Sequence, residues 1–281
     1  MFDLRYHVAS LAAVFIALVI GILVGVGLSG RAVLRERERI NYEARIDQLE
    51  RRVADAEERV RNQEALEAYE RETYPALMEN RLANRRVAAI FIGSFEGELA
   101  QNVRQTIDDT DGTLALRALK VPISTGDLLR AVADVEDAPN TVEDLGRGLA
   151  AELVSSAETP LWDAVGRLLV EEREGGGEID AIVVARTAEP QGGQTARFLD
   201  GFYSGLAAAN VPVVGVETID AEQSTVNTYR DRGFSTVDNV DTLTGRLALA
   251  LVLEGETGSY GIKDDADAVL PPVSPVQQSA G

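Results

Sequence analysis

The sequence VASLAAVFIALVIGILVGVGL, residues 8 to 28, contains no charged side chain and is followed at once by a highly charged stretch. As a helix with a rise of about 1.5 Å per residue it is about 31 Å long, which matches the hydrocarbon core of a bilayer. A cleavable signal peptide has a shorter apolar region, and a buried globular helix rarely lacks every charge over this length. We therefore expect an uncleaved, lipid-embedded anchor at 8–28, preceded by a short flank at 1–7.

The next stretch, from 31 to 73, is dense in Arg and Glu, contains no Pro or Gly, and is predicted to be a helical stalk. Apolar residues recur along it with the alternating spacing of an a/d seam, which indicates a coiled coil. The seam consists of Tyr42, Ile46, Leu49, Val53, Ala56 and Val60. The anchor adds Gly21 and Gly25, a small-xxx-small pattern that lets membrane helices approach closely. We expect a homodimer; the alternative is a single charged helix on the protein's own surface.

Composition limits what the rest of the chain can do. The 281 residues carry a net charge of −19, and residues 87–281 hold 13 basic and 32 acidic side chains. Such an acidic domain repels nucleic acid, so no nucleic-acid partner is expected. The chain has no Cys, and His7 is its only His, so the part after the stalk has no thiolate nucleophile, Ser-His-Asp triad or His-bound zinc. We expect a protein that is not an enzyme and that has no cofactor.

Beyond Pro75, which is predicted to end the stalk, apolar runs alternate with helical segments. Strands are predicted at 87–92, 114–121, 179–185 and 212–217, with a short fifth at 235–237. Helices are predicted up to about 108, at two or three places between 126 and 172 with a start near Thr141, at 194–210 and at 242–253. Uniformly apolar strands alternating with helices predict an α/β domain at 76–254, with a mostly parallel sheet of four to five strands covered by helices. Residues 255–281, rich in Gly, Asp, Pro and Ser, are predicted to be a disordered tail.

The turn after the first strand is one candidate surface for a small ligand or a partner. Gly93 and Ser94 lie between a predicted strand and a predicted helix, where α/β folds often bind phosphate. The segment lacks both the P-loop and the dinucleotide-binding signatures, and Glu96 and Glu98 oppose an anion. A tight turn is therefore the favoured interpretation.

Two further places are candidates for the same kind of surface. Gln194 and Thr195 open a helix after a Gly-rich loop, which makes them the better small-ligand candidate. Asp238 and Asn239 follow the short fifth strand, where a helix start capped by Asp241 or Thr242 is favoured over a contact with a partner. The acidic motifs 108–111 and 264–267 are interpreted as solvated turns rather than cation sites, so any metal ligands are unknown.

Several segments together resemble one actinobacterial family. They are the opening MFDLRYHVASLAAVFIALVIGILVGVGLSG, the charged coil after it, and the later stretches VPVVGVE, STVDNVDTLTGRLALALVL and GSYGIKDDADAVLPP. They resemble the MctB-like family of copper transport outer membrane proteins, which is related to the corynebacterial cell-separation protein SteB. The resemblance covers nearly the whole chain. It implies an envelope protein with one N-terminal anchor, linked to copper efflux or to the control of septal cell-wall hydrolysis.

The residues themselves do not yield a copper site. Cu(I) prefers thiolate and thioether ligands and Cu(II) accepts imidazole, but the chain offers only His7, Met1 and Met78. Four or five short apolar strands also fall short of a transmembrane barrel, which needs at least about eight strands of alternating polarity. Copper is therefore implied by the resemblance alone, and its passage would require a large oligomer or another protein.

Two signals in the sequence disagree about the side of the membrane on which the domain lies. Arg31, Arg35, Arg37 and Arg39 follow the anchor, and the positive-inside rule would place them in the cytoplasm. The resemblance implies export, and we expect the domain on the outer side of the cytoplasmic membrane or at the outer membrane. The leading hypothesis is a role in copper homeostasis. The alternative is an envelope scaffold that binds a partner coiled coil or a peptidoglycan hydrolase to control cell separation.

Overall fold

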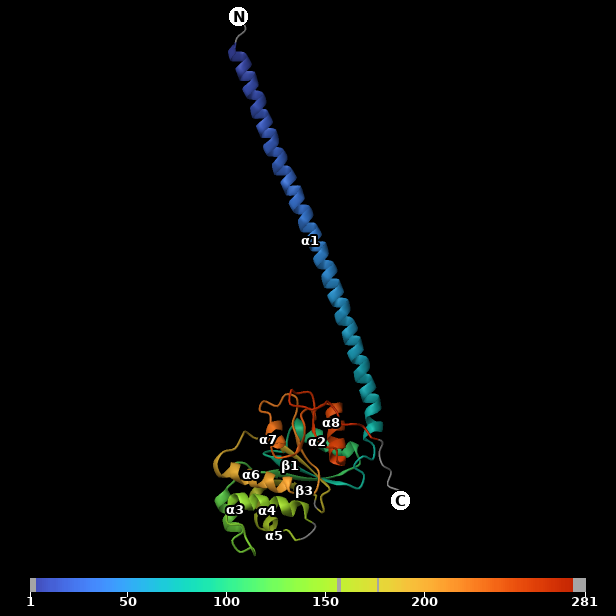
Figure 1. The fold of residues 1–281 in the computed structure, drawn as a ribbon, viewed down its shortest axis with the longest axis vertical. Coiled ribbons are helices and arrows are strands. Elements are labelled where there is room, and N and C mark those ends of the chain that lie inside the picture. Colours follow the sequence, from blue (N-terminus) through green and yellow to red (C-terminus); the bar gives the residue numbers. More distant parts are fainter. Residues whose placement is uncertain (1–3, 156–157, 176, 275–281) are drawn as a thin grey trace. The chain divides into compact units, whose positions relative to one another are not determined.

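The computed structural model describes residues 4–155, 158–175 and 177–274, leaving aside the side chains of 4–6, 27–40, 44 and 171–174. The chain divides into two compact units at Ala68/Tyr69, and each unit is considered by itself. The first contains most of a long helix, α1 (Leu4–Met78), drawn in blue in Figure 1. Residues His7–Val26 of α1 are long and apolar enough to cross a membrane, and none of this stretch is buried.

The end of α1 corrects the prediction that Pro75 terminates the helix. The helix continues through Pro75 to Met78, although an interior proline removes one helical hydrogen bond and costs about 3 kcal/mol. Packing in the second unit offsets this cost. Tyr74 donates a hydrogen bond from its hydroxyl to Oδ2 of Asp109 (2.9 Å), and Met78 is fully buried. Met78 packs against Leu247, Ala250 and Leu251 of α8 (Leu243–Glu254).

The second unit contains a seven-stranded sheet in the order β3-β2-β1-β4-β5-β6-β7. Its strands are β1 (Arg86–Ile92), β2 (Thr113–Leu119), β3 (Val170–Glu174), β4 (Ala181–Arg186), β5 (Val213–Val216), β6 (Ser235–Val237) and β7 (Ser259–Tyr260). All neighbours are parallel except β2 and β3, which are antiparallel. The α/β class with a mostly parallel sheet is confirmed. The predicted count of four to five strands is too low because β3 is highly charged and β7 has two residues.

Helices cover both faces of this sheet (Figure 1). They are α2 (Glu98–Asp109), α3 (Thr125–Ala131), α4 (Val142–Val154), α5 (Pro160–Leu169), α6 (Gly193–Ala207), α7 (Val226–Arg230) and α8. One face packs against α2 and α8, and the other against α3 to α6 and Tyr229 of α7. In β1, Ile90 and Ile92 point into the second of these cores, whereas Ala89 and Phe91 point into the first. Because successive side chains alternate between two dry faces, the strand is apolar from Val87 to Ile92.

Two helix starts expected from the sequence are capped by threonine. The Thr141 hydroxyl accepts a hydrogen bond from the backbone N–H of Asp144 (3.1 Å) at the start of α4. The Thr242 hydroxyl accepts one from the N–H of Gly245 (2.9 Å) at the start of α8. Each satisfies a backbone donor that would otherwise lack an intrahelical partner.

The prediction of a disordered tail is wrong for residues 255–274. This segment supplies β7, and a bridge joins Tyr260 to Ala268. Near its end, Arg81 donates a hydrogen bond from Nη2 to the backbone oxygen of Ser274 (3.2 Å). The residues that this segment contacts are distant in sequence, so its composition, which is typical of disorder, did not reveal these contacts. Residues 275–281 lie outside the described residues.

Candidate functional site

The carboxyl edge of the parallel strands is the part of this fold where ligands usually bind. From β1 the chain moves to β2 on one side, and from β4 it moves to β5 on the other side, so the strand order reverses between β1 and β4. The predicted surface residues all follow β1, β4 or β6 at this edge: Gly93, Ser94, Gln194, Thr195, Asp238 and Asn239. Because β5 separates β4 from β6, these residues form separate groups and not one cluster.

The turn at Gly93 is closed by contacts within the protein. The Thr187 hydroxyl donates a hydrogen bond to the backbone oxygen of Ser94 (2.6 Å), and the N–H groups of Thr187 and Ala188 both donate to Ile92 O (3.1 Å each). Gly93 has φ 112°, and a Cβ there would lie 2.8 Å from Thr187 Oγ1 and 2.9 Å from the Cβ of Ala188. Thr187 and Ala188 therefore fill the space beside Gly93.

The start of α6 also makes a hydrogen bond within the protein. Thr195 is buried, and its hydroxyl accepts a hydrogen bond from the backbone N–H of Ile123 (3.0 Å), in the loop before α3. Gln194 is exposed. Of this predicted pair, only the Gln194 side chain is available to a ligand or partner.

Asp238 and Asn239 support the C-terminal segment and the start of α8. Asp238 is buried and accepts hydrogen bonds from the N–H groups of Ile262 (2.9 Å) and Lys263 (3.1 Å). A Cβ at Gly261, where φ is 143°, would lie 1.9 Å from the Asp238 carboxylate. Asn239 donates from Nδ2 to the hydroxyl of the capping Thr242 (3.2 Å). The segments STVDNVD and GSYGIKDD, quoted above for the resemblance, are therefore in direct contact.

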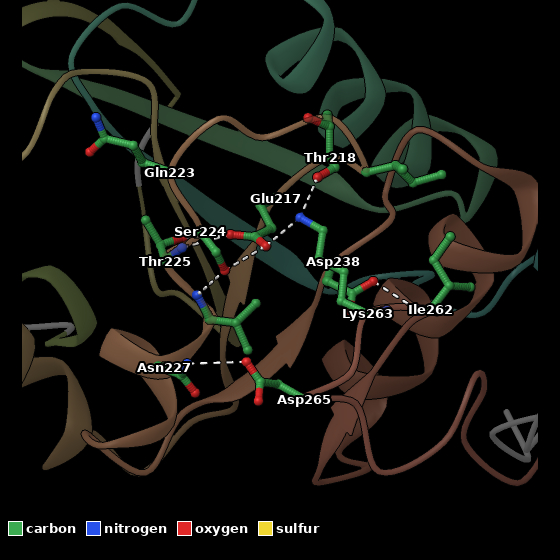
Figure 2. Close-up of polar contacts among 12 residues, drawn as sticks. Glu217, Thr218, Gln223, Ser224, Thr225, Asn227, Asp238, Ile262, Lys263 and Asp265 are labelled. Carbon is green, nitrogen blue, oxygen red and sulfur yellow. Dashed lines mark hydrogen bonds and ion pairs between the residues drawn. The ribbon is translucent and has the colours of Figure 1, made fainter.

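Glu217 and Lys263 form an ion pair at this edge of the sheet (Figure 2). Glu217 directly follows β5 and is 4% exposed. Its carboxylate accepts from Lys263 Nζ (2.6 Å), the Ser224 hydroxyl (2.9 Å) and the Thr225 N–H (2.7 Å). Lys263 Nζ also donates to the backbone oxygen of Thr218 (2.9 Å). These bonds hold the C-terminal segment and the loop after β5 to the end of that strand.

Beside this ion pair lies a cleft of about 300 Å³. Its walls include Arg186 at the end of β4, Glu189, Glu217, Glu222 and Leu99 of α2. Arg186 is half-buried, and among the described residues its recorded hydrogen bond is a long one to the backbone oxygen of Gln223 (3.4 Å).

The inner side of Arg186 lies near a buried aromatic cluster. Burial raises the pKa of Tyr203 to about 12, while the positive charge of Arg186 acts in the opposite direction. Tyr203 packs edge-on against Tyr229 and Phe234. Arg186 therefore lines the cleft within electrostatic range of this aromatic cluster.

Sequence reasoning did not identify Arg186, Glu217 or Lys263. Arg186 and Glu217 each come at the carboxyl end of an apolar strand, and a charged residue in that position is a usable signal. Lys263 gave no such signal because it lies 46 residues from Glu217, in the segment predicted to be disordered.

The described residues contain no group of three or more His, Asp or Glu side chains placed to hold a metal ion. The acidic motifs instead bind other parts of the chain: Asp111 accepts from the N–H of Asn80 (2.9 Å), and Asp267 accepts from the N–H of Ser259 (3.1 Å). Met78 is enclosed in the apolar contact between α1 and α8. The donor set of this chain does not fit a soft-metal site.

Comparison with known proteins gave one result that bears on identity. The family model described as copper transport outer membrane protein, MctB, matches residues 1–271, which include all of α1 and all seven strands. Neither the curated proteins nor the solved structures gave a match. The chain therefore belongs to the family of copper transport outer membrane proteins, MctB.

Proposed function

We propose that this protein is a single-pass, membrane-anchored homodimer that supports copper transport in the cell envelope as a non-enzymatic scaffold. One observation carries the proposal: among the described residues of its own unit, nothing covers the apolar seam of α1. Its large side chains are more than half exposed: Tyr42, Ile46, Leu49, Val53 and Val60. A row of this length and spacing is stable in water when a second helix covers it.

The glycines of the anchor fall in the same heptad frame as the seam. Gly21 and Gly25 precede Tyr42 and Ile46 by three heptads each, along an uninterrupted helix. In a left-handed supercoil such positions stay on one face. A Cβ at either glycine would meet nothing within 4 Å, so this face is open to a second helix. Arg35 and Arg39 fall in the same frame, which limits the apolar contact to its two ends.

The second helix is most simply another copy of this chain. Two copies anchored in one membrane by the same N-terminal helix are parallel and in register, which pairs each seam position with itself. Exposed i,i+4 pairs such as Glu57–Arg61 lie beside the seam and keep its flanks soluble. With so few soft ligands, the chain contributes to copper transport by organising other components and not by carrying the ion.

Cysteine cross-linking tests the dimer directly, because the natural chain contains no cysteine. Ala56→Cys at a seam position is expected to give a disulfide-linked dimer when membranes containing the full chain are oxidised. Glu58→Cys, equally exposed but on the opposite face of the helix, is the matched control and is expected to stay monomeric. Equal cross-linking at both positions, or none at Ala56→Cys, would contradict the parallel seam.

Growth of a deletion strain tests the role. The unaltered protein and the control double variant Gln48→Glu/Ala54→Glu are both expected to restore copper tolerance to this strain. The double variant Ile46→Glu/Val53→Glu is expected to fail. Both pairs add two negative charges, but only the second places them in the seam. Normal copper tolerance with chained, unseparated cells would instead support the second candidate, a scaffold for a partner coiled coil or a cell-wall hydrolase. That candidate is favoured by the exposed Leu66, which lies outside the seam.

A further inference from the structure

The cleft beside Glu217 has the position and size of a binding site for a small molecule. It lies at the carboxyl ends of β4 and β5, next to the point where the strand order reverses, and Leu99 of α2 reaches its wall from the β1 side. This is where open α/β sheets bind ligands. A volume of about 300 Å³ lies at the lower limit of ordinary ligand pockets and is too small for a dinucleotide.

Arg186 supplies the donor for a ligand anion. Its guanidinium carries five N–H groups, and within the described residues it has no ion pair and a single long hydrogen bond to Gln223 O (3.4 Å). A half-buried guanidinium with so few acceptors gains most from a planar, bidentate partner, and a carboxylate provides that geometry.

The other charges of the cleft select against a strongly anionic ligand. Lys263 neutralises Glu217, but Glu189 and Glu222 are exposed carboxylates at the same cleft, and among the described residues Arg186 is the one basic residue that lines it. Two carboxylates against one guanidinium repel phosphates and other dianions and attract an ammonium group.

We propose that this cleft binds a small free zwitterion of the amino acid class. Arg186 receives the carboxylate, Glu222 and Glu189 receive the ammonium group, and Leu99 and Ala221 contact the aliphatic part. The site belongs to the α/β domain and does not depend on the stalk, so it stands apart from the proposed scaffold role.

Calorimetric titration of the detergent-solubilised full chain tests this assignment, with D- and L-alanine, acetate, methylammonium and inorganic phosphate as separate probes. Alanine of one or both hands is expected to bind saturably, with acetate and methylammonium at least tenfold weaker because each offers one of the two charges. Phosphate is expected not to bind. The assignment is overturned by the absence of saturable alanine binding, by acetate binding as tightly as alanine, or by tighter binding of phosphate.

Variants locate the site. Arg186→Gln is expected to weaken alanine binding at least tenfold, whereas Arg197→Gln, an exposed arginine on α6, leaves it unchanged. Glu222→Gln is exposed and cannot disturb the core, so it decides the question if Arg186→Gln fails to fold. It is expected to weaken alanine but not acetate. Alanine affinity that survives Glu222→Gln together with Glu189→Gln would remove this cleft from consideration.

Discussion

Replacing Glu217 with alanine is expected to lower the free energy of unfolding of the α/β domain by about 3 kcal/mol. The carboxylate is 4% exposed and holds Lys263 Nζ and two groups of the loop after β5, the Ser224 hydroxyl and the Thr225 N–H. Its removal leaves the partly buried Lys263 ammonium without its counter-ion and the buried Thr225 N–H without its acceptor. Urea denaturation of the full chain in detergent measures the loss through the fluorescence of Trp162, the only tryptophan, which is buried in α5.

A second substitution, at Lys263, distinguishes the contribution of the ion pair from the loss of packing around Glu217. If the ion pair is the cause, Glu217→Ala combined with Lys263→Met is less destabilised than the sum of the two single variants by at least about 1 kcal/mol. Asp127→Ala removes the acid from the exposed pair with Arg130 and serves as the control, with an expected change within about 0.5 kcal/mol. Additive losses at Glu217 and Lys263 would show that the pair itself contributes nothing.

Replacing Gly201 with alanine is the second large effect, and it is expected to destabilise the domain by about 2–3 kcal/mol. Gly201 lies on α6 where it crosses α4, and a Cβ there would lie 1.9 Å from the backbone oxygen of Glu143. Gly146 of α4 has the reciprocal position, since its Cβ would lie 2.2 Å from Phe198 O. The obstructing atoms belong to the backbone, so one helix has to shift and lose contacts with the sheet.

The same substitution at Gly166 gives a control of opposite sign. Gly166 is inside α5, and a Cβ there meets nothing within 4 Å. Gly166→Ala is therefore expected to stabilise the domain by roughly 0.5–1 kcal/mol, because alanine loses less backbone entropy in a helix. The same urea titration measures both variants. Similar effects at Gly201 and Gly166 would mean that the helix crossing tolerates a side chain.

Local sequence patterns predicted most of the fold because its main strands and caps have local causes. The strands β1, β4 and β5 are apolar since both of their faces are covered, except for Arg86 at the start of β1 and Arg186 at the end of β4. Thr141 and Thr242 are ordinary capping residues. The strand β3 could not be predicted in this way, because its sequence VEERE has neither an apolar run nor a clear alternation. It is a strand because β2 provides an edge for it to pair with.

The candidate site was predictable only as a region. The polar residues predicted after the strands lie at the carboxyl edge of the sheet, but Ser94, Thr195 and Asp238 each take part in hydrogen bonds within the protein. The charged groups that shape the cleft depend on pairings across the fold. Lys263 meets Glu217 only after the C-terminal segment has joined β6, and no local pattern encodes that contact.

The contacts of Arg81 have a consequence for how this domain can be handled as a module. Arg81 lies three residues after the end of α1, and it bonds both to Glu254 at the end of α8 (2.8 Å) and to Ser274 at the end of the described chain. The segment after α1 and the last described residue of the domain thus lie side by side. Domains with adjacent ends can be transplanted into a loop of a host protein without stretching either terminus. This domain can therefore be carried by a host other than its own anchor, with its sheet and cleft preserved.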